Sequence, residues 1–237
     1  MSNMSLAQLG TQHAALSAWP LLGQERAVAT LQGAIGRDAV AHAYLFAGPS
    51  QSGRSTLARL FAQTLNCEGP PAGAAVPLAP CGVCRSCRKI ERGTHPDVQT
   101  VSLAAQEAGG GGSARRDSKN TSLSIETVRE LSAGLSLRPL EGRWRVATVE
   151  DAETMREEAA NAFLKTLEEP PPFAVLILIV PEAGATLPTI RSRCQVVETR
   201  PVAREVLAGA LAARYGVAPD QARILAALAR GRAGWAI

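Results

Sequence analysis

The segment at residues 48–56 constrains the fold of this chain more than any other stretch. It reads Gly-Pro-Ser-Gln-Ser-Gly-Arg-Ser-Thr and joins an apolar run ending at Ala47 to a helical pattern beginning near Ser55. A strand, a glycine-bounded turn and a helix in this order are typical of the loop that wraps phosphates with backbone N–H groups. A simple Gly/Ser turn is the alternative, and the flanking strand and helix patterns favour the phosphate loop.

The loop departs from the phosphate-binding template at one position. The template G-x-x-x-x-G-K-[ST] supplies a lysine for the outer phosphates and a hydroxyl for Mg²⁺. Gly48, Gly53 and the hydroxyl of Ser55 match, and Thr56 follows, but Arg54 occupies the lysine position. A planar guanidinium does not replace a compact ammonium inside a tight loop. We therefore expect the loop shape to persist and ATP binding to be weak or absent.

Four cysteines follow the helix that begins at this loop. They are Cys67, Cys81, Cys84 and Cys87. Four thiolates at this spacing can surround one tetrahedral Zn²⁺ and leave no open position for a substrate, so we expect a structural zinc rather than a catalytic one. Disulfides are the alternative, but a fifth, unpaired Cys194 and a cytosolic setting disfavour them.

Strand and helix patterns alternate along the rest of the chain. Strand patterns lie at 42–47, 95–101, 144–149, 173–180 and 195–198, and helical periodicity lies at 19–36, 55–66, 125–135 and 160–167. The continuous apolar run at 173–180 is typical of a central strand in a parallel sheet that is covered on both faces. The alternation therefore predicts an α/β fold with helices on both faces of a parallel sheet.

Two features beyond this alternation bear on function and organisation. Glu150-Asp151 ends the strand pattern at 144–149, which is where nucleotide enzymes hold Mg²⁺. Beyond Pro201, two helical patterns predict a small separate helical unit, with apolar residues Val206, Leu207, Ala210, Leu211, Ile224, Leu225 and Leu228.

Composition disfavours a membrane protein. The apolar run at 173–180 is too short to span a bilayer, and no signal-peptide core follows Met1. The net charge of +4 permits contact with nucleic acid, but the basic residues are spread rather than clustered. We expect a soluble cytoplasmic protein with no membrane partner.

Several segments, taken in order, resemble bacterial DNA polymerase III clamp-loader subunits. Each is weakly specific alone, and the ordered set is highly specific. They are Gly23-Gln24-Glu25, His42-Ala43-Tyr44-Leu45-Phe46, the loop at 48–56, the four cysteines, Asn161-Ala162-Phe163-Leu164-Lys165-Thr166-Leu167-Glu168-Glu169-Pro170-Pro171 and Ser192-Arg193-Cys194. The resemblance implies an AAA+ (RecA-like) module with a zinc-knot insertion and a C-terminal helical lid. Such modules assemble into complexes that open a sliding clamp and place it on primed DNA.

The resemblance also implies a domain organisation. We expect a disordered lead-in at 1–18, an AAA+ nucleotide-binding-like domain at 19–200 and a helical lid domain at 201–237. The first domain would contain the zinc knot at 67–87 and a mobile loop at 102–122, a glycine-rich stretch without apolar periodicity. The third, collar domain of the family is expected to be absent from this chain.

The family contains two kinds of subunit that the sequence helps to separate. Gamma and tau resemble complete ATPase motors, whereas the delta-prime subunit is a stator that does not hydrolyse ATP. Three features favour the stator: Arg54, the order Glu150-Asp151 where motors carry Asp-Glu, and Val180 where a hydroxyl would sense the γ-phosphate. Exchanging the two carboxylates displaces each by about one methylene, and a shift of ~1 Å can cost on the order of 100-fold in rate. A motor subunit that hydrolyses ATP is the alternative.

The motif Ser192-Arg193-Cys194 carries the remaining expectation. In the family its arginine reaches in trans into the ATP site of a neighbouring subunit, which would make Arg193 a catalytic residue of that site. The alternative is a surface arginine that caps the sheet edge, and Glu168 and Glu169 are expected to be only a solvated helix end. The implied partners are the gamma/tau and delta subunits, the sliding clamp and, through the assembled complex, primed DNA.

Overall fold

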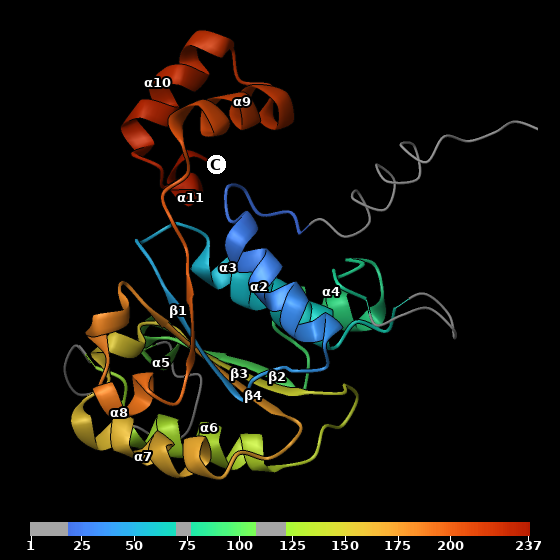
Figure 1. Ribbon diagram of the computed structural model, residues 1–237, viewed down its shortest axis with the longest axis vertical. Coiled ribbons are helices and arrows are strands. Elements are labelled where there is room, and N and C mark those ends of the chain that lie inside the picture. Colours follow the sequence, from blue (N-terminus) through green and yellow to red (C-terminus); the bar gives the residue numbers. More distant parts are fainter. Residues whose placement is uncertain (1–18, 70–76, 108–121) are drawn as a thin grey trace, which may run out of the picture.

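A parallel sheet forms the centre of the molecule (Figure 1). The computed structural model describes residues 19–69, 77–107 and 122–237, and within them five strands take the order β2-β3-β4-β1-β5. Every neighbouring pair is parallel, which confirms the expected α/β fold. The strands are β1 Ala43–Ala47, β2 Val98–Val101, β3 Arg145–Val149, β4 Ala174–Val180 and β5 Gln195–Glu198.

Helices cover both faces of this sheet because its strands alternate two apolar faces. In β1, Tyr44 and Phe46 belong to one core, and Leu45 belongs to the core on the other face. The first core is closed by α2 Glu25–Gly36, α3 Arg54–Leu65 and α4 Arg85–Glu91. The second is closed by α6 Ile125–Ser136, α7 Glu157–Glu168 and α8 Pro188–Arg191.

Local sequence signals set the ends of these helices. Ser124 caps α6, since its hydroxyl accepts a hydrogen bond from the Thr127 N–H at 3.2 Å. Two glutamates lie in the first turn of α7, where they complement the helix dipole, and the prolines at 170–172 follow its end. Two short 3₁₀ turns, Ala152–Thr154 and Ala183–Ala185, follow β3 and β4.

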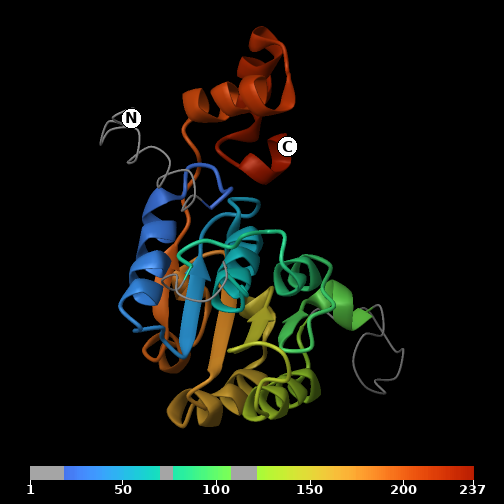
Figure 2. The same ribbon diagram turned by 90° about the vertical axis from the view of Figure 1, so that its right-hand side faces the viewer.

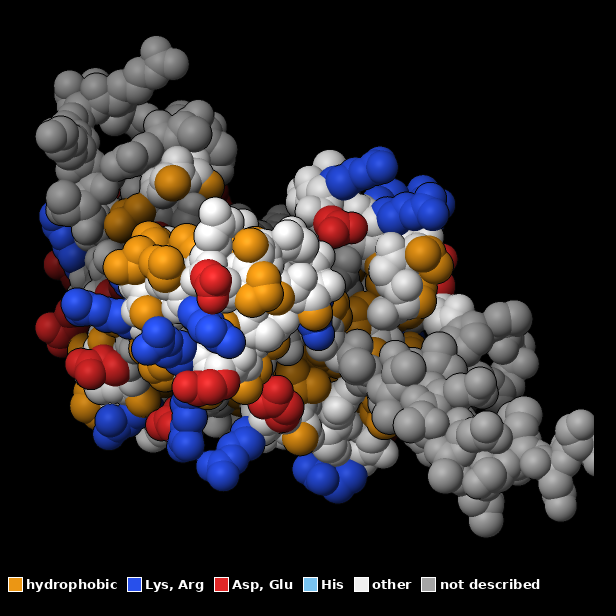
Figure 3. Space-filling model, turned by 90° about the horizontal axis from the view of Figure 1, so that it is seen from above, with side chains coloured by type: hydrophobic (Ala, Val, Ile, Leu, Met, Phe, Trp, Pro, Cys, Tyr) orange, Lys and Arg blue, Asp and Glu red, His pale blue; other side chains and the backbone are white. Residues whose placement is uncertain are grey.

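A helical unit lies beyond the carboxyl-terminal ends of the strands (Figure 2). It contains α9 Arg204–Tyr215, α10 Pro219–Ala229 and α11 Ala233–Ala236. Its core joins Leu207 and Leu211 of α9 to an alanine face of α10. Ile224 and Leu228, part of the expected apolar pattern of α10, are instead exposed, because Ala222, Ala226 and Ala229 form the face of α10 that packs in this core. Apolar side chains are correspondingly visible at this end of the molecule (Figure 3).

Two sequence expectations need correction. The first helix begins at Glu25 rather than at Trp19. The expected mobile loop at 102–122 contains a helix, α5 Leu103–Glu107, which starts where the Ser102 hydroxyl accepts a hydrogen bond from the Ala105 N–H at 3.1 Å. Residues 108–121 of that loop and the expected lead-in at 1–18 lie outside the described residues. Within the described residues, no helix is long and apolar enough to cross a membrane.

Candidate functional site

The glycine-bounded segment forms a loop between β1 and α3, as its sequence predicts. Gly53 adopts a left-handed backbone with φ 97° directly before α3, a conformation that glycine reaches without strain. Gly48 is required for a different reason. A Cβ atom there would lie 2.1 Å from Thr199 Oγ1 and 2.5 Å from the Thr199 carbonyl oxygen. The loop is therefore packed against the residue that follows β5.

Polar side chains from distant segments hold the loop in this shape. The Ser52 and Thr199 hydroxyl oxygens lie 2.6 Å apart. The Gln24 amide donates to the carbonyl oxygens of Ser52 at 3.2 Å and Arg200 at 2.6 Å, and the Arg200 N–H donates back to Gln24 Oε1 at 3.0 Å. Gln24 and Thr199 were not predicted as site residues. The only sequence signal for Gln24 was its place in the Gly-Gln-Glu motif.

The helical unit also contacts the loop. The Gly234 N–H of α11 donates to the Gln51 carbonyl oxygen at 3.0 Å, and a Cβ atom at Gly234 would lie 3.3 Å from that oxygen. Glycine therefore permits this close approach of α11. The two parts are joined at the segment where a nucleotide phosphate would bind.

Arg54 is the first residue of α3 and is partly buried. Burial lowers the pKa of its guanidinium, and the nearby carboxylates of Glu153, Asp151 and Glu150 act in the opposite direction. The charge of Arg54 thus interacts with acidic groups of its own chain. A residue in this setting offers less free positive charge to a phosphate than an unopposed lysine does.

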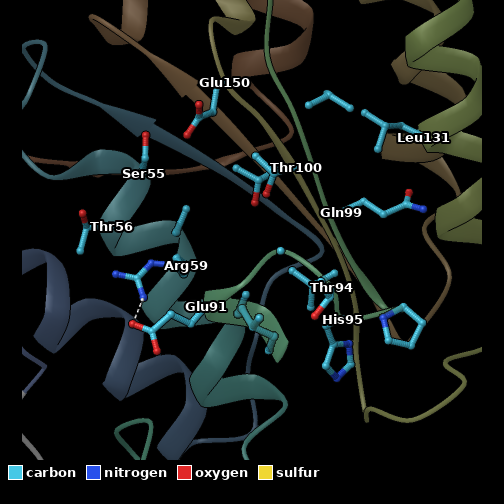
Figure 4. A pocket seen from close by; sticks show the side chains of 18 of the residues that line it. Ser55, Thr56, Arg59, Glu91, Thr94, His95, Gln99, Thr100, Leu131 and Glu150 are labelled. Carbon is cyan, nitrogen blue, oxygen red and sulfur yellow. Dashed lines mark ion pairs between the residues drawn. The ribbon is translucent and has the colours of Figure 1, made fainter. Parts of the chain in front are cut away.

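The structure brings Ser55, Thr56 and Glu150 to one cavity of about 790 Å³. Figure 4 shows Ser55 and Glu150 at the same end of this cavity, and a hydroxyl and a carboxylate are both oxygen ligands that Mg²⁺ accepts. Asp151 is not among the residues that line it and adopts a left-handed backbone with φ 55°. Val180 ends β4 as a fully buried apolar side chain, so it offers no hydroxyl.

The far end of the cavity borders the cysteine-rich segment. Arg59 of α3 and Glu91 of α4 form an ion pair at 3.5 Å there, and His95 lines the cavity on its opposite side, next to Thr94 (Figure 4). Burial lowers the pKa of His95, whose ring contacts the Ser86 hydroxyl at 3.2 Å. The cavity therefore connects the candidate nucleotide loop to the base of the cysteine knot.

The four predicted cysteines come together. The Sγ atoms of Cys67, Cys81, Cys84 and Cys87 all lie within 4.8 Å of one another. The Cys84 N–H donates to Cys81 Sγ and the Cys87 N–H to Cys84 Sγ, both at 3.3 Å. Burial works against ionisation of Cys81, but backbone donors at Cys84 and Val83 outweigh it and lower its pKa to about 7. Four sulfur atoms lie close together, and two of them accept hydrogen bonds from backbone N–H groups. This arrangement fits a tetrahedral thiolate site for Zn²⁺.

Arg193 lies apart from the loop, in the turn between α8 and β5. Its Nη2 donates to Glu168 Oε1 at 2.9 Å, and its Nη1 donates to the Thr189 carbonyl oxygen at 3.0 Å. The side chain is 37% exposed. Glu168, expected to be only a solvated helix end, is therefore the ion-pair partner of Arg193. Cys194, the next residue, packs against the second core, and burial raises the pKa of its thiol to about 12.

The sheet order, the glycine-bounded loop and the helical unit over it define an AAA+ (RecA-like) module. Among solved structures, a gamma subunit-related protein of DNA polymerase III from Thermotoga maritima matches with a TM-score of 0.58 and 23% identity, covering 88% of this chain and 57% of that chain. The Thermotoga maritima RuvB Holliday junction branch migration motor matches with a TM-score of 0.55 and 17% identity, covering 91% and 60%. At these identities the likeness concerns the fold alone.

Sequence comparison identifies the family. Residues 23–203 match the family described as DNA polymerase III, delta subunit. The Mycobacterium tuberculosis gamma/tau subunit is 35% identical over 174 residues, 73% of this chain and 27% of that protein. The Pseudomonas aeruginosa delta' subunit is 38% identical over 159 residues, 67% and 43% respectively. The chain belongs to this family of DNA polymerase III clamp-loader subunits. It spans less than half the length of these curated relatives.

Proposed function

We propose that this chain is the stator of a cytoplasmic DNA polymerase III clamp loader. It would fold as an AAA+ domain at 19–200 and a lid domain at 201–237, and would work beside gamma/tau and delta subunits to load a sliding clamp onto primed DNA. In this role it supplies Arg193 to ATP held by a neighbouring motor subunit. The observation that carries the proposal is an altered loop, in which Arg54 occupies the lysine position and interacts electrostatically with Glu153, Asp151 and Glu150, combined with an exposed Arg193.

The loop supports a weak or absent ATPase activity. A motor needs a cation that reaches the outer phosphates, a carboxylate that orients water and a polar group that senses the γ-phosphate. Here the cation is a partly buried arginine, the acidic pair is reversed, and β4 ends in a buried valine. The Gly234 N–H of the proposed lid donates a hydrogen bond to the Gln51 carbonyl oxygen, so the lid contacts the loop directly.

The cysteine cluster supports a structural role for zinc. The Gln63 amide of α3 donates to the Cys87 carbonyl oxygen at 2.9 Å, and Arg143 Nη2 donates to the Cys67 carbonyl oxygen at 3.1 Å. A bound Zn²⁺ would neutralise thiolate charge and close the knot. The residues of this chain then tie the knot to α3 and to the segment before β3.

The motor alternative has one observation in its favour. Ser55 and Glu150 line the same end of one cavity, as a Mg²⁺ site requires. Steady-state ATP hydrolysis by the isolated chain separates the two functions, since a motor turns over ATP and a stator does not.

Substitution of Arg193 tests the stator proposal directly. In a loader reconstituted with its partner subunits, Arg193→Ala should reduce ATP hydrolysis and slow clamp loading, because an arginine supplied in trans stabilises charge on the transferring phosphoryl group and is worth ~10³ to 10⁵ in rate at its site. The total rate should fall less, since other ATP sites keep their own arginines. Arg193→Lys should restore little activity, because an ammonium lacks the planar bidentate geometry.

Arg191→Ala is the matched control, because Arg191 is an exposed arginine two residues away. It should leave the rates unchanged. If loaders containing Arg193→Ala assemble and hydrolyse ATP at the unmodified rate, Arg193 is only a cap on the strand that follows it.

A further inference from the structure

We propose that Glu168 is a positioning residue for Arg193. In this inference, which rests on the proposed role of Arg193, the carboxylate at the end of α7 fixes the direction of the guanidinium before a neighbouring ATP site is present. Glu168 does not contact that ATP itself. It acts through the arginine that it holds.

Two contacts from different elements define the position of the guanidinium. The Glu168 carboxylate comes from the last residue of α7, and the Thr189 carbonyl oxygen comes from α8. Both helices are anchored in the second core, through Leu167 and Ile190, which flank the two contact residues in sequence and are buried. The acceptors are therefore fixed relative to the sheet, although the arginine that they hold lies at the surface.

The two hydrogen bonds leave the arginine able to bind a phosphate. A guanidinium carries five N–H donors, and the hydrogen bonds to Thr189 and Glu168 use one donor on each Nη atom. In the described part of the chain, the Nε–H and one N–H on each Nη atom are then left for another acceptor. Phosphate oxygens accept such donors in pairs. The ion pair with Glu168 therefore need not break when Arg193 engages a neighbour's phosphate.

The ion pair between Arg193 and Glu168 is too exposed to hold the two side chains together permanently. The Arg193 and Glu168 side chains are 37% and 53% exposed, and pairs of this kind contribute weakly to stability. Their effect is on side-chain freedom, because a free arginine samples many rotamers and must be ordered when it binds. Removal of the Glu168 carboxylate should therefore lower the rate of ATP hydrolysis, because Arg193 becomes disordered. The free energy of unfolding should change little.

A neutral variant separates positioning from electrostatic restraint. Glu168→Gln keeps an oxygen acceptor at the same place and removes the negative charge. If Glu168 positions Arg193, Glu168→Gln should retain most of the activity that Glu168→Ala loses. If the carboxylate instead holds Arg193 back from the phosphate, both variants should raise the rate of ATP hydrolysis, and the proposal is wrong.

The first measurement uses the isolated chain. Nitrogen-15 relaxation of the arginine Nε–H groups, with the Arg193 signal assigned from the spectrum of Arg193→Ala, should show greater fast motion of Arg193 in Glu168→Ala than in the unmodified chain or in Glu168→Gln. Glu169→Ala removes the adjacent exposed carboxylate and is the matched control that should change nothing. Unchanged Arg193 motion in Glu168→Ala overturns the proposal whatever the assembled loader does.

The second measurement uses the reconstituted loader. Glu168→Ala should lower ATP hydrolysis at the site that Arg193 serves by about three- to tenfold, less than Arg193→Ala does, since an exposed ion pair restricts the arginine only in part. Added to Arg193→Ala, it should cause no further loss, because both changes act through one side chain. If Arg193→Ala lowers the rate and Glu168→Ala does not, the positioning role fails while the proposed function stands. If neither lowers it, both fail.

Discussion

A single buried carboxylate, Asp97, organises the turn before β3. Its two oxygens accept the N–H groups of Leu140, Glu141 and Gly142 at 2.7 to 2.8 Å, and Arg145 Nη1 lies 3.5 Å from Oδ1. Burial alone would raise the pKa of Asp97. The three backbone donors and Arg145 outweigh it, so the pKa lies below the ordinary value of 3.8. The ionised form is therefore the one that the fold stabilises.

We predict that Asp97→Asn costs about 3 kcal/mol of folding free energy at neutral pH, because Arg145 is left buried without its counter-charge. A group whose pKa is lowered by folding stabilises the protein above its unfolded pKa and loses this effect as the pH falls through its folded pKa. The difference between unmodified chain and variant should hence shrink below about pH 4. Urea unfolding at several pH values measures it.

Asp220→Asn is the control for this prediction, because the Asp220 side chain is 94% exposed in its pair with Arg223. It should change stability little at any pH. An Asp97→Asn variant with the acid sensitivity of the unmodified chain would show that the buried carboxylate is not the titrating group.

Site residues whose partners lie nearby in sequence were predictable. Residues whose partners lie far away in sequence were not. The spacing of four cysteines within one segment predicts a metal site, and their sulfur atoms lie within 4.8 Å of one another. The hydrogen-bond partners of Asp97 instead lie 43 to 45 residues away in sequence, and one partner of Gln24 lies 176 residues away. No local pattern carries such a pairing. Glu168 was misjudged for the same reason, since its partner Arg193 lies on another element.

At the scale of elements, α3 links the phosphate loop to the cysteine knot. Its first turn follows Gly53, and towards its other end Gln63 donates to the Cys87 carbonyl oxygen. Arg59 adds an ion pair to Glu91 of α4. The cysteine knot thus stabilises α3, the helix that follows the loop. Loss of the knot should therefore destabilise the packing of the whole first core.

We predict that the chain binds one Zn²⁺ through its four clustered cysteines. Removal of the metal by chelation, or Cys84→Ser, should lower the melting temperature by roughly 5–10 °C, the shift that about 2–3 kcal/mol produces in a chain of this size. Metal analysis and thermal unfolding measure both effects. Cys194→Ser, which alters the cysteine outside the cluster, should leave the zinc content at one.

This prediction has a clear contrary result. Protein purified without chelator that contains no zinc, or that melts at the same temperature with and without it, would show that the four thiols pack without a metal.

Elements with a long or uniform pattern were predicted well. β4, a continuous run of apolar residues, starts one residue later than expected and ends at the expected residue. The helix α5 was missed because five residues are too few to show a period, and its start depends on the Ser102 cap. The buried face of α10 was also missed, because alanines form it and the larger Ile224 and Leu228 lie on the exposed side of the helix.

At the scale of the molecule, the arrangement of the parts depends on contacts between remote segments. The strand order places β1 between β4 and β5, and the loop after β1 contacts Thr199 after β5 and Gly234 of the helical unit. Sequence motifs implied this architecture through resemblance to a family. The hydrogen bond between the helical unit and the loop joins two backbone groups, the Gly234 N–H and the Gln51 carbonyl oxygen, and no sequence pattern indicates such a pairing.

The last prediction concerns nucleotide turnover by the whole chain. The isolated protein should hydrolyse ATP at least about 100-fold more slowly than a motor subunit, and Arg54→Lys should not restore motor-like rates, because a misplaced carboxylate alone costs that much. The substitution repairs the cation but leaves Glu150-Asp151 in reversed order and Val180 at the end of β4. It should strengthen ATP binding, since an ammonium suits the loop better than a guanidinium. Binding of a fluorescent ATP analogue and steady-state phosphate release measure the two effects separately.

Arg59→Lys is the matched control, because Arg59 lies one turn further along α3, lines the same cavity and is paired with Glu91. Arg59→Lys should change neither ATP binding nor ATP hydrolysis appreciably, since it keeps a positive charge at a position that lies outside the loop. Rapid ATP hydrolysis by the unmodified chain would favour the motor function. Motor-like rates in Arg54→Lys alone would show instead that a single cation separates the two kinds of subunit, and that the reversed order of Glu150 and Asp151 is tolerated.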